Sequence, residues 1–244
     1  MNKYLELIRL PNVITASADS WAGFFIILAI PGAGAAASPA WGILPLIVLV
    51  SCVLYAAGVI FNDVVDFEHD KTHRPDRPLP SGRIPRSTAF TAGAVLVVLA
   101  MLLAMLIAML AGWERLIIAF VLLFSIVVYT LLSKAAPAAS VPVMGLCRAL
   151  NVALGMGLTA SVIKASPSTL VAPGVLFLCT VAISLISLAE HKDKRAQKFV
   201  KYGVLSLPAI NGILLLAYGA LLASLFCFAV CAGAVILSKR LPVS

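Results

Sequence analysis

Long apolar runs separated by short polar gaps make up most of the chain. A helix needs about 20 residues to cross the hydrocarbon core of a bilayer, and by this measure the runs predict eight membrane-spanning helices. We expect them near residues 12–31, 43–65, 88–110, 114–133, 141–162, 169–189, 201–218 and 220–238. The last two are divided near Tyr218 and Gly219, because the stretch from Val204 to Leu237 would be about 50 Å long as a single helix. The pattern predicts an all-α, polytopic membrane bundle.

The polar gaps carry most of the positive charge, on one side of the predicted membrane. Lysines and arginines lie before the first span and after the second, fourth, sixth and eighth. They are Lys3, Arg9, Lys71, Arg74, Arg77, Arg83, Arg86, Lys134, Lys192, Lys194, Arg195, Lys198, Lys201, Lys239 and Arg240. The opposite gaps carry only Arg115, beside Glu114, and Lys164. Because cytoplasmic loops are enriched in Lys and Arg, we expect both termini and the polar loops 66–87 and 190–200 to be cytoplasmic.

The composition is that of a membrane protein, and the distribution of charge argues against nucleic acid as a partner. The chain has 244 residues, of which 62% are hydrophobic and 11% charged, whereas a soluble domain is about 45–50% apolar and about 25% charged. The net charge of +8 does not indicate nucleic-acid binding, because the basic residues cluster between spans. The five cysteines lie inside apolar runs and are interpreted as small buried hydrophobic residues. We expect one domain, 1–244, in two four-helix halves of about 1–140 and 141–244, with no cleavable signal peptide.

Asn62, Asp63, Asp66 and Asp70 form an acidic cluster where the second span meets the first polar loop. A charge at bilayer depth costs at least a few kcal/mol and needs a partner or a function. Asn62, Asp66 and Asp70 are four residues apart, so a helix that continued through them would place three oxygen ligands on one face, with Asp63 close by. The spacing predicts a site for a hard cation such as Mg²⁺, which prefers oxygen ligands and leaves room for substrate phosphate.

Four arginines follow the acidic cluster: Arg74, Arg77, Arg83 and Arg86. Guanidinium groups bind phosphate oxygens through paired hydrogen bonds, so acids and arginines together indicate a site for a metal-bound phosphate ester or diphosphate. The alternative is that these are solvated charges that only set the topology, and for Arg83 and Arg86 both interpretations stay open. The three histidines, His69, His73 and His191, have no zinc-like spacing and are interpreted as solvated.

These motifs resemble those of the UbiA superfamily of intramembrane prenyltransferases. Its first aspartate-rich motif, NDxxDxxxD followed by RPLxSG, matches Asn62–Asp70 and Arg77–Gly82. The likeness extends to Leu10–Asp19, to Tyr129 and Lys134, and to Met144–Asn151. The resemblance implies a central cavity in which Asn62, Asp66 and Asp70 bind Mg²⁺ carrying the diphosphate of an isoprenoid donor. It also implies transfer of the prenyl group to a lipophilic, usually aromatic, acceptor within the membrane.

The chain departs from this family in the second acidic motif. Family members place two aspartates four residues apart after the sixth span, whereas this chain reads SLAEHKDKR, with Glu190, Asp193 and then Lys194. The resemblance makes Glu190 and Asp193 further metal ligands, and Lys194 stands where a ligand is expected. Either a second metal binds weakly or Lys194 contacts the diphosphate directly. The context is closest to a divergent, EboC-like branch, and a ninth span common in the family is expected to be missing.

Several polar residues inside the spans have both a structural and a functional interpretation. Asp19 is expected to pair with Arg148 or Lys134, or to position substrate. Arg148 and Asn151 are one helical turn apart and face the same side, where they could join helices or line the site. The resemblance favours the site for these residues and for Tyr129, and assigns Arg77, Lys134, Arg148 and Lys194 to the diphosphate. Gly155 and Gly157 are interpreted as packing glycines.

The sequence therefore predicts a Mg²⁺-dependent prenyltransferase, with membrane lipid, an isoprenoid diphosphate and a lipophilic acceptor as partners. One alternative is a non-catalytic protein that binds or transports prenyl lipids and has a degraded second metal site, as Lys194 suggests. The CDP-alcohol phosphotransferases also use membrane aspartates, but their DG…AR pattern is absent from the chain.

Overall fold

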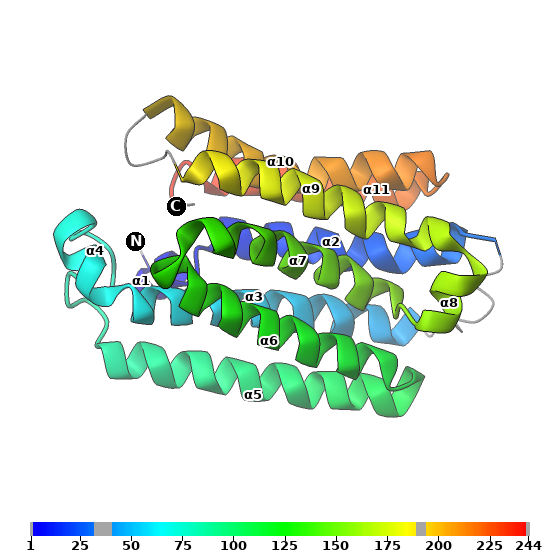
Figure 1. The fold of residues 1–244 in the computed structure, drawn as a ribbon, viewed down its shortest axis with the longest axis horizontal. Helices are drawn as coiled ribbons and strands as arrows, with labels where there is room; N and C mark the ends of the chain where they lie inside the picture. The colour runs from blue at the N-terminus through cyan, green and yellow to red at the C-terminus, as the bar shows by residue number, and fades with distance from the viewer. Residues whose placement is uncertain (1, 32–40, 189–193, 243–244) are drawn as a thin grey trace.

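The computed structural model describes residues 2–31, 41–188 and 194–242, and their regular secondary structure is entirely helical (Figure 1). The helices are α1 Lys3–Leu7, α2 Leu10–Ala29, η1 Trp41–Ile43, α3 Leu44–Val65, α4 Phe67–His73, α5 Arg86–Ala111, α6 Glu114–Ala135, α7 Pro137–Met156, α8 Ala160–Ala165, η2 Pro167–Leu170, α9 Val171–Ser187, α10 Lys194–Ala217 and α11 Leu221–Leu237. Among the described residues, seven helices are long and apolar enough to cross a membrane, and α11 is a shorter apolar helix. The predicted all-α membrane bundle is confirmed.

Single residues such as proline and glycine set the ends of the helices, and the apolar runs alone do not reveal them. The predicted fifth span, 141–162, is shifted: α7 begins at Pro137, which suits a first helical turn, and ends at Met156 because Gly157 adopts a left-handed φ of 62°. The predicted break near Gly219 is confirmed, since this glycine has a φ of 78° between α10 and α11. The expected boundary between two halves, near residue 140, falls inside α7, and the division into halves stays a prediction.

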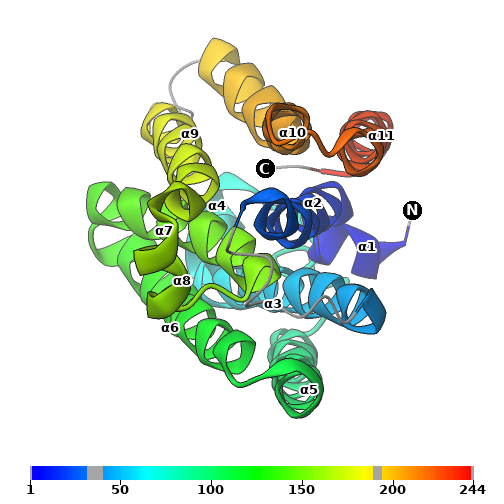
Figure 2. The ribbon, with the colours of Figure 1, turned by 90° about the vertical axis from the view of Figure 1, so that its right-hand side faces the viewer.

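Helix α2 lies at the centre of the bundle, in contact with α3, α7, α10 and α11 (Figure 2). Its sequence suits this position, because most of its residues are buried and many of these are small or weakly polar. Close contact with α7 depends on glycine: a Cβ atom at Gly155 would lie 2.0 Å from the Ser20 carbonyl oxygen, and one at Gly23 would lie 2.0 Å from that of Val152. The prediction that Gly155 serves helix packing is confirmed.

Helix α5 lies at the edge of the bundle and packs on α3 and α6 (Figures 1 and 2). The face it buries is made mainly of small residues, Ala89, Gly93, Ala100, Ala104 and Ala108. Large apolar side chains such as Leu102 and Met109 are exposed on the other face. In a membrane protein this face is suited to lipid, so α5 needs only a narrow stripe of small residues to pack against α3.

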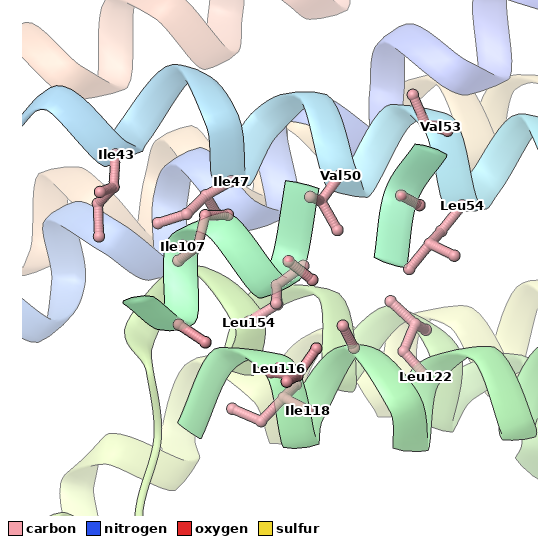
Figure 3. Packing of buried hydrophobic residues seen from close by; sticks show 14 of the residues in the cluster. Ile43, Ile47, Val50, Val53, Leu54, Ile107, Leu116, Ile118, Leu122 and Leu154 are labelled. Atoms are coloured by element: carbon pink, nitrogen blue, oxygen red, sulfur yellow. The ribbon is translucent and has the colours of Figure 1, made fainter. Parts of the chain in front are cut away.

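The half of α3 remote from the acidic cluster is packed into an apolar core with α5, α6 and α7 (Figure 3). Ile47 and Val50 project from α3 toward Ile107 and Leu154, and Leu54 projects toward Leu122. Their side chains are almost completely buried. Because burying apolar side chains excludes water, this core closes one end of the bundle, and polar groups gather at the other end of α3.

Candidate metal and diphosphate site

A cavity of about 770 Å³ lies inside the bundle and is lined by residues of α2, α3, α4, α6, α7, α9 and α10. The charged residues and the histidine that line it are Arg9, Asp66, His69, Asp70, Arg74, Arg77, Lys134 and Arg148. Its apolar lining includes Val59, Leu122, Ile126, Ile183, Val204 and Leu207. The expected central cavity is therefore present, and it joins charged groups at the ends of the helices to apolar surface between them.

Asn62, Asp66 and Asp70 all line this cavity, although the helix that carries them is not continuous. Helix α3 ends at Val65, as the predicted span 43–65 does, and a separate helix, α4, begins at Phe67. The backbone N–H of Asp66 still donates to the Asn62 carbonyl at 2.8 Å, and that of Asp70 donates to the Asp66 carbonyl at 2.8 Å. Because these bonds keep the four-residue helical relation across the break, the three side chains remain on one wall.

Asp66 is held by neighbours that leave it open to the cavity. Asn62 Nδ2 donates to Asp66 Oδ2 at 2.9 Å, while Asn62 Oδ1 accepts a hydrogen bond from Ser133 at 3.4 Å. Lys134 Nζ lies 3.8 Å from Asp66 Oδ1 and donates to the Val65 carbonyl. Burial raises the pKa of Asp66, the Lys134 ammonium opposes this rise, and the carboxylates of Asp70 and Asp63 add to it.

Asp63, predicted among the metal ligands, lies elsewhere. It is buried, is absent from the cavity lining, and accepts a hydrogen bond from Arg9 Nη2 at 2.6 Å. Arg77 Nη1 lies 3.5 Å from Asp63 Oδ1 and donates to Asp70 Oδ2 at 2.7 Å. Asp63 thus joins the loop arginine to the start of α2. Arg9 was not predicted as a site residue, and its left-handed φ of 49° at the N-cap of α2 places it there.

Arg77 lines the cavity as predicted, with one nitrogen to spare. Its Nη2 is buried and has no hydrogen-bond partner among the described residues. Burial and the neighbouring Arg9 lower the pKa of Arg77, while the Asp63 and Asp70 carboxylates oppose this effect. A guanidinium nitrogen without a partner beside a carboxylate wall suits a phosphate oxygen.

A second polar cluster joins α2, α7 and α10 within the bundle. Arg148 Nη1 donates to Asp19 Oδ2 at 2.7 Å, which decides between the two partners expected for this aspartate. Asn151 Nδ2 lies 3.3 Å from the same oxygen, and Asn211 Nδ2 donates to Asp19 Oδ1 at 2.8 Å. Asp19 is 0% exposed and does not line the cavity, whereas Arg148 and Asn151 do, as expected from their shared side. Sequence reasoning missed Asn211, although an amide inside an apolar run is a signal of this kind.

The remaining predicted residues lie in different places. Tyr129 lines the cavity. Lys194, at the start of α10, is exposed and is not among the lining residues. Glu190 and Asp193 fall outside the described residues. His69, interpreted as solvated, is exposed, and it also lines the cavity 3.9 Å from Asp70 Oδ1.

The oxygen atoms on the α3–α4 wall fit a magnesium ion that arrives with a diphosphate. Within residues 2–31, 41–188 and 194–242, no three His, Cys, Asp or Glu side chains come together as a metal site. Mg²⁺, however, is usually held through one or two carboxylates while phosphate and water complete its coordination. Asp66 and Asp70 meet this requirement, with the Asn62 amide beside them.

The pattern of the UbiA prenyltransferase family matches residues 23–243, which are most of the chain. The chain belongs to this family. Curated relatives include digeranylgeranylglyceryl phosphate synthases from two archaea. The Sulfurisphaera tokodaii protein is 36% identical over 102 residues, which are 40% of this chain and 33% of that protein. The Methanosarcina barkeri protein is 34% identical over 126 residues, which are 50% of this chain and 44% of that protein. The matched region therefore spans less than half of each relative.

Solved structures share the UbiA-like fold over nearly the whole chain. A structure of digeranylgeranylglyceryl phosphate synthase has a TM-score of 0.61 and 21% identity, covering 98% of this chain and 87% of that one. A UbiA homolog from Archaeoglobus fulgidus, bound to DMAPP and Mg²⁺, has a TM-score of 0.56 and 16% identity, covering 100% of this chain and 89% of that one. Together with the helices, these likenesses establish a multi-pass integral membrane protein with the UbiA-like architecture.

Proposed function

We propose that the protein transfers a prenyl group from an isoprenoid diphosphate to a lipophilic acceptor within the membrane, in a Mg²⁺-dependent reaction. The observation that carries this proposal is the single cavity that joins Asn62, Asp66 and Asp70 to Arg77 and to apolar surface. Family membership supports the reaction type, and the A. fulgidus homolog bound to DMAPP and Mg²⁺ supports the donor and the metal.

Each part of the cavity has a separate task in this reaction. Asn62, Asp66 and Asp70 are the metal ligands, and Glu190 and Asp193 are proposed to add to them. The bound ion offsets negative charge on the departing diphosphate. Arg77 and Lys134 donate to diphosphate oxygens, as does Lys194 from the start of α10. Preorganised donors of this kind stabilise charge where it develops.

The apolar lining protects the reacting prenyl group from hydrolysis. Val59 and Ile126 line the cavity from α3 and α6, and Val204 and Leu207 line it from α10. An allylic cation that forms there meets few water molecules, so capture by an organic acceptor is favoured over hydrolysis. Tyr129, one helical turn from Ile126 on α6, lies between this surface and Lys134 and is proposed to contact the substrate.

The names of the curated relatives widen the range of acceptors to be considered. The resemblance of the motifs favours an aromatic acceptor, whereas the curated relatives are named for a glyceryl phosphate that bears two geranylgeranyl groups. A polyprenylglyceryl phosphate therefore belongs beside aromatic acids among the acceptors to be tested. Placement in the EboC-like branch and a cytoplasmic position for both termini remain predictions.

The alternative is a protein that binds or transports prenyl lipids without turnover. The lysine at position 194, where the second acidic motif of the family has a metal ligand, favours this alternative. Purified protein in lipid nanodiscs, labelled prenyl diphosphates of several lengths and a panel of acceptors separate the two functions. We expect prenyl transfer and pyrophosphate release that stop when EDTA removes Mg²⁺. Metal-dependent binding without pyrophosphate release, for every donor and acceptor, would reject the transferase in favour of the binding protein.

A further inference from the structure

Among the described residues, Arg77 lines the cavity and Arg83, which follows the RPLPSG motif, does not. Each nitrogen of the Arg83 guanidinium group has a partner within the protein. Nη1 forms an ion pair with Glu6 at 2.7 Å, while Nε donates to Ser81 Oγ at 3.1 Å and Nη2 donates to the Asp76 carbonyl at 2.7 Å. Arg83 therefore joins segments of the protein outside the cavity, which the sequence alone did not decide.

Ser81 links Arg83 to Arg77, the residue proposed to bind the diphosphate. Ser81 Oγ donates to the Arg77 carbonyl at 2.7 Å, and the Ser81 backbone N–H donates to the same oxygen at 3.0 Å. A hydroxyl group can accept one hydrogen bond while it donates another, so the side chain of Ser81 contacts both arginines at once. The position of the Arg77 backbone therefore depends on Arg83.

Glu6, on helix α1, lies at the other end of this series of contacts. It is only 6% exposed, and a carboxylate that is buried to this extent is almost always paired. Its ion-pair partner among the described residues is Arg83. Lys3, on the same helix, donates from Nζ to the Arg83 carbonyl at 2.8 Å. Helix α1 therefore holds Arg83 through both its side chain and its backbone.

Apolar side chains hold the same segments against α3. Leu7 of α1, Leu79 and Ile84 of the loop, and Ile60 and Val64 of α3 are buried together in one cluster. Burial of this kind stabilises the contact but has no preferred direction, so it holds the loop on α3 without fixing the orientation of its backbone. Hydrogen bonds depend strongly on angle and distance. The contacts of Arg83 are therefore the ones that can fix this orientation.

We infer that Glu6 and Arg83 are positioning residues for the diphosphate contact of Arg77, an inference that rests on the proposed transferase function. Arg77 Nη2 is buried and has no partner among the described residues, and a buried donor without a partner costs free energy. Contacts elsewhere in the loop must offset this cost if Arg77 is to stay in place. Arg83 provides such contacts, Glu6 orients Arg83, and Ser81 connects both to the Arg77 backbone.

Binding of inorganic pyrophosphate with Mg²⁺ to the protein in nanodiscs tests this role without turnover. We expect Glu6→Gln and Arg83→Gln each to weaken pyrophosphate binding about tenfold, the order expected for one misplaced charged donor. The double variant should bind about as weakly as Arg83→Gln alone, because both changes disrupt the same ion pair. Amide hydrogen exchange over residues 74–84 should become faster in all three, since their local opening becomes easier.

Arg86→Gln is the matched control, because Arg86 is an exposed arginine nearby whose guanidinium group lies over the Phe67 ring. It should bind pyrophosphate as the wild type does. Arg83→Lys keeps the charge but not the three nitrogens, so it should bind as weakly as Arg83→Gln, and wild-type affinity would overturn the inference. Weaker binding in Arg83→Gln with unchanged binding in Glu6→Gln would also overturn it, because Arg83 would then contact the diphosphate directly.

Ser81→Ala removes only the side-chain link to Arg77, and Ser81 is exposed, so this variant should fold even if Glu6→Gln does not. Transfer assays separate the positioning role from the proposed function. Faster exchange over residues 74–84 in Ser81→Ala and Glu6→Gln, without prenyl transfer by the wild type, would support the positioning role and reject the transferase. Transfer with an unchanged KM for prenyl diphosphate in both variants would do the reverse. Support for both would be this KM raised about tenfold, with an unchanged KM for the acceptor.

Discussion

Asp66 is the carboxylate of the acidic cluster that is most available to a cation. Asp63 forms a close ion pair with Arg9 at 2.6 Å, and Asp70 forms one with Arg77 at 2.7 Å. Among the described residues, the ion-pair partner of Asp66 is Lys134 at 3.8 Å, and Asp66 also accepts a hydrogen bond from the Asn62 amide. A residue paired this loosely at a cavity wall can exchange its contacts for a metal ion without breaking a close ion pair.

Replacing Asp66 by Asn should weaken Mg²⁺-dependent binding of a prenyl diphosphate by roughly ten- to a hundredfold. The estimate follows from losing one charged ligand, worth about 1.5–3 kcal/mol. Binding is measured with labelled prenyl diphosphate in the presence and absence of Mg²⁺. Asp76→Asn, an exposed aspartate in the same loop, is the matched control and should bind as the wild type does. Equal affinity in Asp66→Asn would remove this residue from the ligand set.

The contrast between Asp63 and Asp66 shows how much of the site could be predicted residue by residue from the sequence. The motif showed that four oxygen-bearing side chains gather at the end of α3, and three of them line the cavity. It did not distinguish Asp63, because its partner Arg9 is 54 residues away and reaches it only through the turn between α1 and α2. Contacts between distant segments of this kind depend on packing that motif spacing does not contain.

Removing one partner of the Asp19–Arg148 pair should lower the free energy of unfolding strongly. Removing both partners together should lower it much less. Arg148→Met leaves a buried carboxylate with only amide partners, and we expect a loss of about 3–5 kcal/mol in the free energy of unfolding. The double variant Asp19→Leu, Arg148→Met should lose less than the sum of the single variants, because neither charge is left alone. Unfolding in mixed micelles measures both. Arg86→Met, an exposed arginine at the start of α5, serves as the control. Strictly additive losses would contradict the pairing.

At the scale of elements, the contact of α2 with α7 determines where Asp19, Arg148 and Asn151 meet. The two backbones approach closely only because Gly23 and Gly155 lack side chains. The apolar runs predicted both helices, and they predicted Gly155 as a packing residue. They did not predict the short helix α4 within the loop 66–87 or the start of α7 at Pro137, because neither segment is marked by a long apolar run.

Gly155→Ala should destabilise the protein by about 1–3 kcal/mol, the usual cost of overpacking. The added Cβ meets the Ser20 carbonyl oxygen, and backbone on backbone leaves no flexible side chain to move. Gly233→Ala is the matched control, because nothing lies within 4 Å of a Cβ there. Its stability should be unchanged or slightly higher, since alanine favours helix over glycine. Thermal unfolding in detergent compares the two, and equal melting temperatures would contradict the close approach.

At the scale of the whole molecule, α4, the start of α1 and the end of α11 lie at one end of the bundle, and α8 lies at the other (Figure 1). Sequence charge predicted which side faces the cytoplasm, and helix packing alone does not test that orientation. Ser87→Cys, at the start of α5, and Ser161→Cys, in α8, form a matched pair of exposed serines. In right-side-out vesicles, an impermeant maleimide should label Ser161→Cys and should label Ser87→Cys only after permeabilisation. The reverse order would invert the predicted topology.

Two helices at opposite edges of the bundle differ in length. Helix α5 has 26 residues and α11 has 17, which correspond to about 39 Å and about 26 Å, and they lie at opposite edges (Figure 2). A bilayer with a hydrocarbon core of about 30 Å is too thin for the first helix and too thick for the second. The mismatch of α11 with the bilayer is therefore opposite in sign to that of α5, and a membrane accommodates such differences by helix tilt or by local thinning of the lipid.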